Sequence, residues 1–381
     1  MKLLIFCPYY PPHIGGLENH ADEFNKYLSL RGMDIVVFTP HLPHSAPEFE
    51  TRHNNVRIIR FPAFEIIPNY PLPKFWSFKF WKLFFGLFSE KSDIAISRTR
   101  FFTTSLMALL YAKIRRSEWI HIEHGSDFVR LSSNFKTFVA KIYDYTFGFL
   151  IFRFCDQNIS ISYAVQKFVK KFDKRKSPVI YRGLDFAAMD TAKPDEEMKN
   201  KYRDKIIINW TGRLYKWKGV EKSILAIKSL SEDIKKKIVF LIIGDGEDFD
   251  RLKEIAKDEP VIVFLGNIPR EKAIGILKIS DIYLHSAYMG GGLSTSLLEA
   301  MYCGCAVIAT PNEGAAEIVK NDENGILIEK PDEKLIANSI VRLIADSEKI
   351  KRLGDKAKIH ILNNFNWKKS IESYVEIFRK Q

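Results

Sequence analysis

Residues 290–301 read Gly-Gly-Gly-Leu-Ser-Thr-Ser-Leu-Leu-Glu-Ala-Met, and this stretch decides the fold. The apolar run at residues 281–285 predicts a short strand before the glycines. After the glycines, apolar side chains recur at helical spacing in Leu297, Leu298, Ala300 and Met301. Ser294 or Thr295 can cap the helix that this spacing predicts. The chain is therefore expected to pass from a strand through glycines into a helix.

The same stretch suits an anion. Glycines before a helix N-terminus expose backbone N–H groups beside the positive end of the helix dipole, which favours a phosphate. Gly292, Leu293, Ser294 and Thr295 would present those groups. Glu299 lies about one turn further along, where a carboxylate can accept hydrogen bonds from sugar hydroxyls. The alternative is a tight strand-to-helix turn followed by a solvated glutamate.

The composition describes a globular protein with a basic surface. The 381 residues are enough for two domains of ordinary size, and 46% of them are hydrophobic. The net charge of +12 favours phosphates, nucleic acid or anionic lipid as partners. Cys303 and Cys305 lack a second pair or a nearby histidine, so buried thiols are favoured over a metal site. No run of about 18 uncharged apolar residues occurs, so no transmembrane helix is expected.

The N-terminal half predicts a parallel sheet. Residues 2–7 and 34–39 are strand-like runs, joined by a loop that ends in Gly15-Gly16 and by a helical pattern. Open α/β sheets bind ligands at the carboxyl ends of their strands, so Gly15 and Gly16 could close on a sugar or a phosphate. The alternative for this loop is a plain strand-to-helix turn.

His124 follows a further predicted strand at residues 119–123. An imidazole at the carboxyl end of a strand can hydrogen-bond a substrate hydroxyl, and Asp127 is a weaker candidate in the same loop. A single histidine is more often a satisfied core residue, but the position of His124 at this edge favours a functional role.

Residues 74–88 combine aromatic and basic side chains. At helical spacing, Trp76 and Phe80 share a broad apolar face, and Lys79 and Lys82 lie opposite. This pattern is typical of a helix in a bilayer interface, with basic residues directed at anionic headgroups. The candidates for membrane or acceptor contact are Trp76, Lys79, Phe80, Trp81 and Lys82. The alternative is a helix buried in the first domain.

A second α/β series follows a polar stretch at residues 185–205, which we interpret as a linker. The predicted strand at residues 206–210 leads into a glycine loop with Arg213 and Lys218. The planar fork of an arginine and the point charge of a lysine can converge on a diphosphate. The alternative is two solvated cations. In a later loop, the backbone at Asn267 and Ile268 could lie along the edge of a nucleobase.

Taken in order along the chain, these motifs and predicted elements resemble those of the retaining glycosyltransferases of the GT-B fold, in the large group called family 4. The resemblance covers nearly the whole chain and rests on the motifs Pro11-Pro12…Gly15-Gly16…His20, His124-Gly125, Gly212-Arg213…Lys218-Gly219, Gly244-Asp245-Gly246 and Leu297-Leu298-Glu299-Ala300-Met301-Tyr302-Cys303-Gly304. It implies an α/β protein with two Rossmann-like domains that face each other across a cleft. Residues 1–184 would bind the acceptor and residues 185–365 the nucleotide sugar. A C-terminal helix at about residues 366–381 would pack back onto the first domain.

The resemblance also implies roles for single residues. Arg213 and Lys218 would bind the diphosphate and stabilise the leaving group, a task that other enzymes give to a metal ion, so no metal site is expected. Glu299 would hold the ribose hydroxyls. His124 would contact the transferred sugar near its anomeric carbon, and Gly16 would approach the phosphates or the sugar. Transfer would retain the anomeric configuration by front-face attack, with the leaving phosphate helping to deprotonate the acceptor.

One position departs from the family pattern. The family commonly has a second glutamate, eight positions before the one matched by Glu299, and that glutamate contacts the donor sugar. Gly291 occupies this position here, and neither Met289 nor Gly290 replaces the carboxylate. Three explanations remain open: another group contacts the sugar, the donor differs from the common hexoses, or the protein has lost activity.

Two hypotheses follow from different classes of protein. The first is an enzyme: a hexosyltransferase-like peripheral membrane protein on the cytoplasmic face, which needs no cofactor and extends a lipid-linked, polysaccharide or glycan acceptor. Its donor is a nucleotide sugar, with a UDP-sugar favoured over a GDP-sugar. The second is a catalytically silent, membrane-associated partner subunit with the same fold.

A sugar epimerase of this fold would need a paired acid and base, which we do not identify. Nucleic acid is not expected, because the basic residues cluster on helix-like segments instead of alternating with aromatics across strands.

Overall fold

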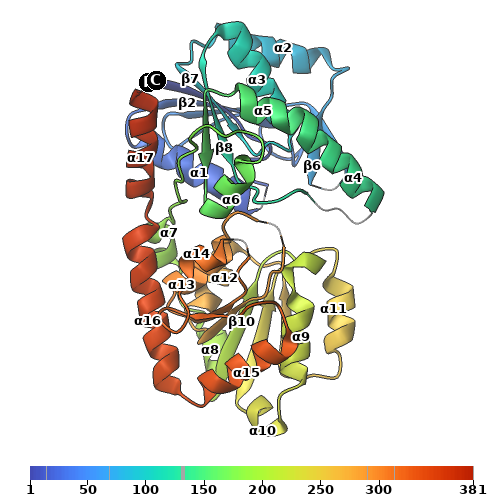
Figure 1. Ribbon diagram of the computed structural model, residues 1–381, viewed down its shortest axis with the longest axis vertical. Helices are drawn as coiled ribbons and strands as arrows, with labels where there is room; N and C mark the ends of the chain where they lie inside the picture. The colour runs from blue at the N-terminus through green and yellow to red at the C-terminus, as the bar shows by residue number, and fades with distance from the viewer. Residues whose placement is uncertain (14, 68, 130–133, 290, 313, 381) are drawn as a thin grey trace. The chain divides into compact units, whose positions relative to one another are not determined.

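The computed structural model describes residues 1–13, 15–67, 69–129, 134–289, 291–312 and 314–380. The chain divides into two compact units (Figure 1). We call Met1–Gly183 together with Trp367–Gln381 the N-terminal unit, and Leu184–Asn366 the C-terminal unit. The predicted break between residues 184 and 185 lies one residue from this division. Gly290, in the stretch that opens the sequence analysis, lies outside the described residues.

The N-terminal unit is built on a seven-stranded sheet of order β3-β4-β2-β1-β7-β8-β9. Neighbouring strands pair in parallel except at the edge, where β3 runs antiparallel to β4. The strand order reverses between β1 and β7, and open α/β sheets bind ligands beside the carboxyl ends of the strands at such a switch point. The strands are β1 (Lys2–Phe6), β2 (Asp34–Pro40), β3 (Phe49–Arg52), β4 (Val56–Phe61), β7 (Ile94–Arg98), β8 (Glu118–Glu123) and β9 (Gln157–Ser160).

Helices surround this sheet, and a separate hairpin of β5 (Ala63–Ile67) and β6 (Tyr70–Pro73) precedes α2. The sequence pattern did not predict this hairpin. The helices are α1 (Gly16–Ser29), α2 (Phe78–Gly86), η1 (Leu87–Ser89), α3 (Thr103–Arg115), α4 (Asn134–Tyr143), the π-helical turn η2 (Asp144–Gly148), α5 (Phe149–Phe154), α6 (Tyr163–Val169) and α17 (Trp367–Arg379). The last of these packs against α1: the rings of Phe24 and Tyr374 lie 4.9 Å apart, and Trp367 Nε1 donates to Glu23 Oε2 at 2.9 Å.

Helix α2 is shorter than the predicted helix over residues 74–88 and is buried on one face. Phe80 is 1% exposed and packs edge-on against Phe61 at 5.6 Å. The prediction that Phe80 contacts a membrane or acceptor is therefore wrong, because its ring belongs to the core beside the sheet. Trp76, at 73% exposed, precedes the helix, and Trp81 is 37% exposed. The buried-helix and surface-helix interpretations thus each describe one face of α2, the helix labelled at the top of Figure 1.

The C-terminal unit is built on a six-stranded, fully parallel sheet of order β12-β11-β10-β13-β14-β15. Its order reverses between β10 and β13, which places a second switch point there. Strand β11 is buried at every residue, as expected for a strand that is covered on both faces. The strands are β10 (Ile206–Thr211), β11 (Ile238–Ile243), β12 (Ile262–Gly266), β13 (Ile282–His285), β14 (Ala306–Ala309) and β15 (Ile326–Leu327).

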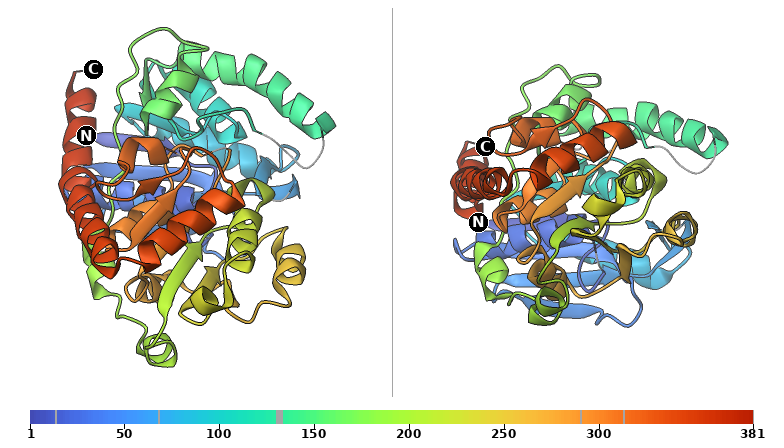
Figure 2. Two further views of the ribbon diagram at one scale, coloured as in Figure 1. Left: turned by 60° about the horizontal axis from the view of Figure 1, so that its bottom comes forward. Right: turned by 90° about the horizontal axis from the view of Figure 1, so that it is seen from below.

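Helices cover both faces of this second sheet (Figure 2). Alternate residues of β10 and β11 point to opposite sides, so Ile208 and Phe240 pack with α9, α11 and α15, whereas Ile207 and Val239 pack with α8 and α12. The helices are α7 (Phe186–Thr191), α8 (Glu196–Lys201), η3 (Lys216–Lys218), α9 (Val220–Lys228), α10 (Glu232–Lys235), α11 (Phe249–Ala256), α12 (Arg270–Leu277), α13 (Thr295–Tyr302), α14 (Ala315–Ile318), α15 (Glu333–Ile344) and α16 (Ser347–Asn364).

The stretch at residues 185–205 is not an extended linker. It forms α7 and α8, each capped by an aspartate side chain: Asp185 accepts from Ala188 N and Asp195 from Met198 N. Charged residues dominate its sequence because few of its side chains face the core, but Met189 and Met198 are buried and hold it to the C-terminal unit. Across the described ranges, we find no helix long and apolar enough to cross a bilayer.

Candidate active site

The switch point of the C-terminal unit brings together two predicted segments. Strands β10 and β13 pair in parallel, so the loop after β10 and the start of α13 leave the sheet side by side. Tyr283 joins them: its Oη donates to the carbonyl oxygen of Thr211 at 3.1 Å and lies 2.9 Å from Ser296 Oγ. The sheet therefore holds the Arg213–Lys218 loop and the N-terminus of α13 next to each other.

The loop that carries Arg213 and Lys218 is fixed at both ends. Gly212 N donates to Ile243 O at 3.0 Å, and Leu214 N donates to Asp245 O at 2.9 Å, which ties the loop to the end of β11. On the other side, Ser286 Oγ donates to the carbonyl oxygen of Lys218 at 3.1 Å. The loop is thus anchored to the strands on either side of β10, and both cations come from this fixed backbone.

Both cationic side chains are partly exposed and lie beside aromatic rings. Lys218 Nζ lies 4.6 Å from the centre of the Trp217 ring. Arg213 Nη1 lies 3.5 Å from Tyr215 Oη, and the Tyr215 and Trp217 rings stack at 5.9 Å. Ring faces attract cations and limit the motion of their side chains. The interpretation of two freely solvated cations is therefore disfavoured.

Helix α13 begins at Thr295, with Ser294 at the cap position. Ser294 is thus the cap residue, one of the two predicted, but its side chain makes no capping hydrogen bond; Ser294 Oγ lies 3.3 Å from Ser296 Oγ instead. A first turn whose N–H groups are not taken by a cap side chain is suited to an anion. Leu293 and Ser294 are each 8% exposed, which keeps this turn close to the sheet.

Glu299 is 7% exposed and has a partner that the sequence analysis missed. Arg270 Nε and Nη2 both donate to Glu299 Oε1, at 2.9 and 2.7 Å. Arg270 directly follows the loop with Asn267 and Ile268, so this ion pair joins the predicted nucleobase loop to the predicted ribose-binding carboxylate. The sequence did contain a signal for this partner: Arg270 is a cation at the first position of the helix that follows the candidate nucleobase loop.

The switch point of the N-terminal unit holds His124 together with two residues outside the predicted site. The rings of His20 and His124 meet edge-to-face at 4.8 Å, and Arg98 Nη1 lies 2.8 Å from His20 Nδ1. Burial lowers the pKa of His124 well below its ordinary value, and the charge of Arg98 lowers it further. Burial likewise lowers the pKa of His20, helped by His124 and Arg98. Both imidazoles are therefore neutral at physiological pH.

His124 is not a satisfied core histidine. Its Nε2 atom is buried and has no hydrogen-bond partner among the described residues. Buried polar atoms in native proteins are nearly always paired, and an exception calls for a ligand, a water or a catalytic role. Gly15 and Gly16 belong to the connection from β1 to α1, where Gly16 begins α1 and Arg182 Nη1 donates to its carbonyl oxygen at 3.4 Å.

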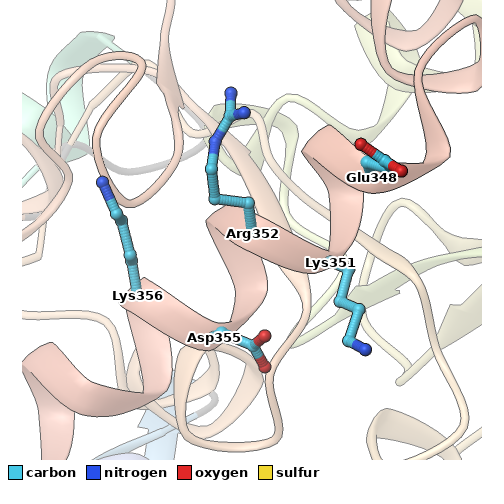
Figure 3. Close-up of a pocket in the computed structure, with 5 residues that line it drawn as sticks. All are labelled: Glu348, Lys351, Arg352, Asp355 and Lys356. Carbon is cyan, nitrogen blue, oxygen red and sulfur yellow. The ribbon is translucent and has the colours of Figure 1, made fainter.

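A surface pocket elsewhere in the C-terminal unit lacks converging polar side chains. Its lining comes from one helix, α16, and consists of Glu348, Lys351, Arg352, Asp355 and Lys356 (Figure 3). Arg352 and Lys356 extend to one side of the helix and Lys351 to the other, so these side chains do not converge. Among the described residues, no group of three or more His, Cys, Asp or Glu side chains could hold a metal ion.

Comparison with known proteins identifies the family. The model of Glycosyltransferase Family 4 matches residues 14–188, and that of Glycosyl transferases group 1 matches residues 192–360. An uncharacterized glycosyltransferase of Methanocaldococcus jannaschii, MJ1069, is 47% identical over 387 residues, which cover 100% of this chain and 98% of the relative. The chain belongs to the family 4 glycosyltransferases, and it is an enzyme of the glycosyltransferase class.

Solved structures confirm the GT-B fold. HepE of Anabaena, in complex with UDP-glucose, superposes with a TM-score of 0.77 at 18% identity over 100% of both chains. Sucrose-phosphate synthase of Thermosynechococcus elongatus superposes with a TM-score of 0.78 at 17% identity, over 100% of this chain and 98% of that one. The prediction of two Rossmann-like α/β domains is thereby confirmed.

The anchoring of the cation loop can be tested at Gly219, which has φ +70°. A Cβ there would collide with the carbonyl oxygen of Ser286, so we expect Gly219→Ala to displace Lys218. Gly266 is a matched control, with φ +68° and no atom within 4 Å of an added Cβ. Gly266→Ala should cost only about 1–2 kcal/mol of unfolding free energy, the cost of the left-handed backbone. Chemical denaturation should show a larger loss for Gly219→Ala; equal losses would contradict the anchoring.

Proposed function

We propose that this glycosyltransferase moves a sugar from a nucleotide-diphosphate sugar to a lipid-linked, polysaccharide or glycan acceptor, with retention of configuration and without a metal ion. The observation that carries the proposal is that the loop of Arg213 and Lys218 lies next to the N-terminal segment of α13 at the β10–β13 switch point. HepE, which shares the fold, is described in complexes with UDP and UDP-glucose. A more distant relative in Bacillus anthracis, 22% identical over 99% of this chain and 97% of its own length, is an N-acetyl-alpha-D-glucosaminyl L-malate synthase.

The C-terminal unit would hold the diphosphate. Arg213 offers two parallel N–H donors to phosphate oxygens, and Lys218 adds a point charge. The N–H groups at the start of α13 add the positive end of a helix dipole. When the bond to the anomeric carbon breaks, negative charge develops on the leaving phosphate, and donors that are already in place stabilise it.

The ribose and the base would lie beside Glu299. Arg270 donates twice to Oε1 and orients the carboxylate, so Glu299 can accept hydrogen bonds from ribose hydroxyls through its other oxygen. The backbone at Asn267 and Ile268, next to Arg270 in sequence, would contact the edge of the base. We favour a UDP-sugar over a GDP-sugar as the donor.

His124 and Gly16 would act on the sugar. A neutral imidazole with an unpartnered nitrogen can exchange a hydrogen bond with a sugar hydroxyl near the anomeric carbon. Such a contact would orient the sugar for front-face attack, while the leaving phosphate takes the proton of the acceptor. Because His124 is neutral, we assign it a positioning contact and not the role of a charged acid.

Gly291 motivates the second candidate, a catalytically silent partner subunit. Its φ of +69° is a backbone conformation that glycine adopts freely and a glutamate rarely does. The loop is therefore built around glycine and could not take the missing glutamate without strain. We favour the enzyme because the anchored cations, the Arg270–Glu299 pair and the unpartnered His124 Nε2 are all retained.

We further propose that the enzyme works peripherally on the cytoplasmic membrane face. Five side chains around α2 form an aromatic patch that we define as Phe75, Trp76, Phe78, Trp81 and Phe85, which are 50%, 73%, 83%, 37% and 58% exposed. Exposed rings beside basic side chains suit a bilayer with anionic headgroups. Lys82, which follows Trp81 in α2, is exposed, whereas Lys79 Nζ pairs with Glu48 at 2.5 Å. Helix α4 presents further exposed rings at Phe135 and Phe138.

The donor site can be tested with cations from one loop. Arg213→Ala and Lys218→Ala should each lower kcat/KM by about 10²–10³, the effect of removing a donor that stabilises transition-state charge. Lys216→Ala is the matched control, because Lys216 is an exposed cation of the same loop, and it should change kcat/KM less than twofold. Release of nucleoside diphosphate would be measured across UDP- and GDP-sugars with lipid-linked acceptors. If no donor binds to or reacts with the wild type, the result would favour the catalytically silent partner subunit.

Membrane contact predicts a defined loss in vesicle flotation. Burial of an aromatic side chain stabilises by about 1.5–3 kcal/mol, so Trp76→Ser/Phe78→Ser should weaken partitioning onto anionic vesicles by at least tenfold. The charge change Lys79→Glu/Lys82→Glu should weaken it as well. Ile359→Ser, which removes an apolar side chain that is 57% exposed on α16, should have no effect. Equal flotation of all four proteins would refute the membrane proposal at this segment.

A further inference from the structure

A cluster of buried charged residues contacts the backbone of His124, and none of them has a role in the proposed donor binding. Glu123, the last residue of β8, is fully buried and bends back on its own loop. Its Oε1 accepts hydrogen bonds from the backbone nitrogens of His124 at 3.0 Å and Gly125 at 2.6 Å. The backbone from which the His124 imidazole extends is therefore held by a carboxylate.

Arg100 connects this carboxylate to three other segments. Its backbone nitrogen and Nη1 donate to Glu123, at 3.0 and 3.1 Å. Its Nε and Nη2 form a fork on Asp144, each at 3.0 Å, and Nη2 also donates to the carbonyl oxygen of Asp127 at 2.9 Å. Asp144 begins the π-helical turn between α4 and α5, and such turns are frequent at functional sites. One guanidinium thus joins the loop after β7, the loop of His124 and the α4–α5 helices.

A second chain of hydrogen bonds fixes the other carboxylate oxygen. Trp119 Nε1 donates to Ser97 Oγ at 2.9 Å, so the Ser97 hydroxyl can donate to His121 Nδ1 at 2.8 Å. With Nδ1 accepting from Ser97, His121 Nε2 carries a proton and donates it to Glu123 Oε2 at 3.2 Å. Both oxygens of Glu123 therefore have donors from several directions, and its side chain has one orientation.

This cluster is costly if its only role is stability. Arg100, Glu123 and Asp144 are each at most 1% exposed, and buried ions often stabilise no better than apolar side chains of similar size. Burial raises the pKa of Glu123, but the charge of Arg100 and the hydrogen bonds from His121 and Gly125 hold it at about 2, so it stays ionised. In some proteins buried polar or ionic groups of this kind serve to fix a geometry.

We propose that Glu123 and Arg100 are positioning residues for the transfer reaction, which hold the His124–Gly125 backbone so that the His124 imidazole meets the sugar in a reactive geometry. The inference rests on the proposed role of His124. It predicts a split between rate and affinity, because the C-terminal unit holds the diphosphate while His124 contacts the transferred sugar. Displacement of His124 should lower kcat and leave donor affinity unchanged.

Glu123→Gln tests this inference, with Asp173→Asn as the matched control. Asp173 is 5% exposed and pairs with Arg175 in the same unit, and it accepts a further hydrogen bond from Asn158 Nδ2 at 2.8 Å, away from the His124 loop. We expect Glu123→Gln to lower kcat at least tenfold with the donor KM within twofold, measured well below the melting temperature of each variant. Asp173→Asn should keep kcat within twofold even where its melting temperature falls as far. Equal kcat losses in the two variants, or no loss in Glu123→Gln, would overturn the proposal.

A second variant covers the case in which Glu123→Gln does not fold. A Cβ on Gly125 would lie 3.0 Å from Arg100 Nη1 and 3.1 Å from Glu123 Oε1, so Gly125→Ala presses on the cluster and removes no charge. It should show the same fall in kcat at unchanged donor KM, and unchanged kcat would count against the proposal. His124→Ala separates the proposed role of His124 from the positioning role of Glu123 and Arg100. If it is as active as the wild type, the proposed role of His124 fails; if it is inactive while Glu123→Gln and Gly125→Ala are normal, only the positioning role fails.

Discussion

One topological constraint positions the candidate site: a parallel sheet that reverses its strand order leaves two adjacent strand ends whose loops diverge. In the C-terminal unit those strands are β10 and β13. The loop of the first supplies Arg213 and Lys218, and the helix after the second supplies backbone N–H groups. Neither segment is an anion site by itself. The hydrogen bonds of Tyr283 and Ser286 across the switch point hold the two segments next to each other, as the proposed diphosphate site requires.

The N-terminal unit uses the same topology with a different electrostatic result. Its switch point, between β1 and β7, holds two neutral histidines beside the buried Arg98. Burial and the nearby guanidinium keep protons off the imidazoles, so this unit offers hydrogen bonds where the other offers positive charge. The two switch points therefore differ in electrostatic character, because each sheet edge carries different charged groups.

The sequence predicted the elements better than it predicted their partners. Glycine loops, strand runs and helical spacing located both sheets and every loop that the site uses, because these features are local. The partners Arg270 of Glu299, Arg98 of His20 and Arg100 of Glu123 come from other elements, so no local pattern reveals them. Phe80 was misassigned for a related reason: the helical pattern showed an apolar face, but only the sheet beside it decides whether that face meets the core or a surface. The polar stretch at residues 185–205 hid two helices because only single side chains of each, Met189 and Met198, are buried.

The most direct test of the central claim is a crystal structure of the protein with a bound nucleoside diphosphate sugar. The account predicts that the diphosphate oxygens lie within hydrogen-bond distance of the Arg213 guanidinium, the Lys218 ammonium and the backbone nitrogens at the start of α13, with the ribose on Glu299. A diphosphate bound elsewhere on the chain, with Arg213 and Lys218 turned to solvent, would contradict it.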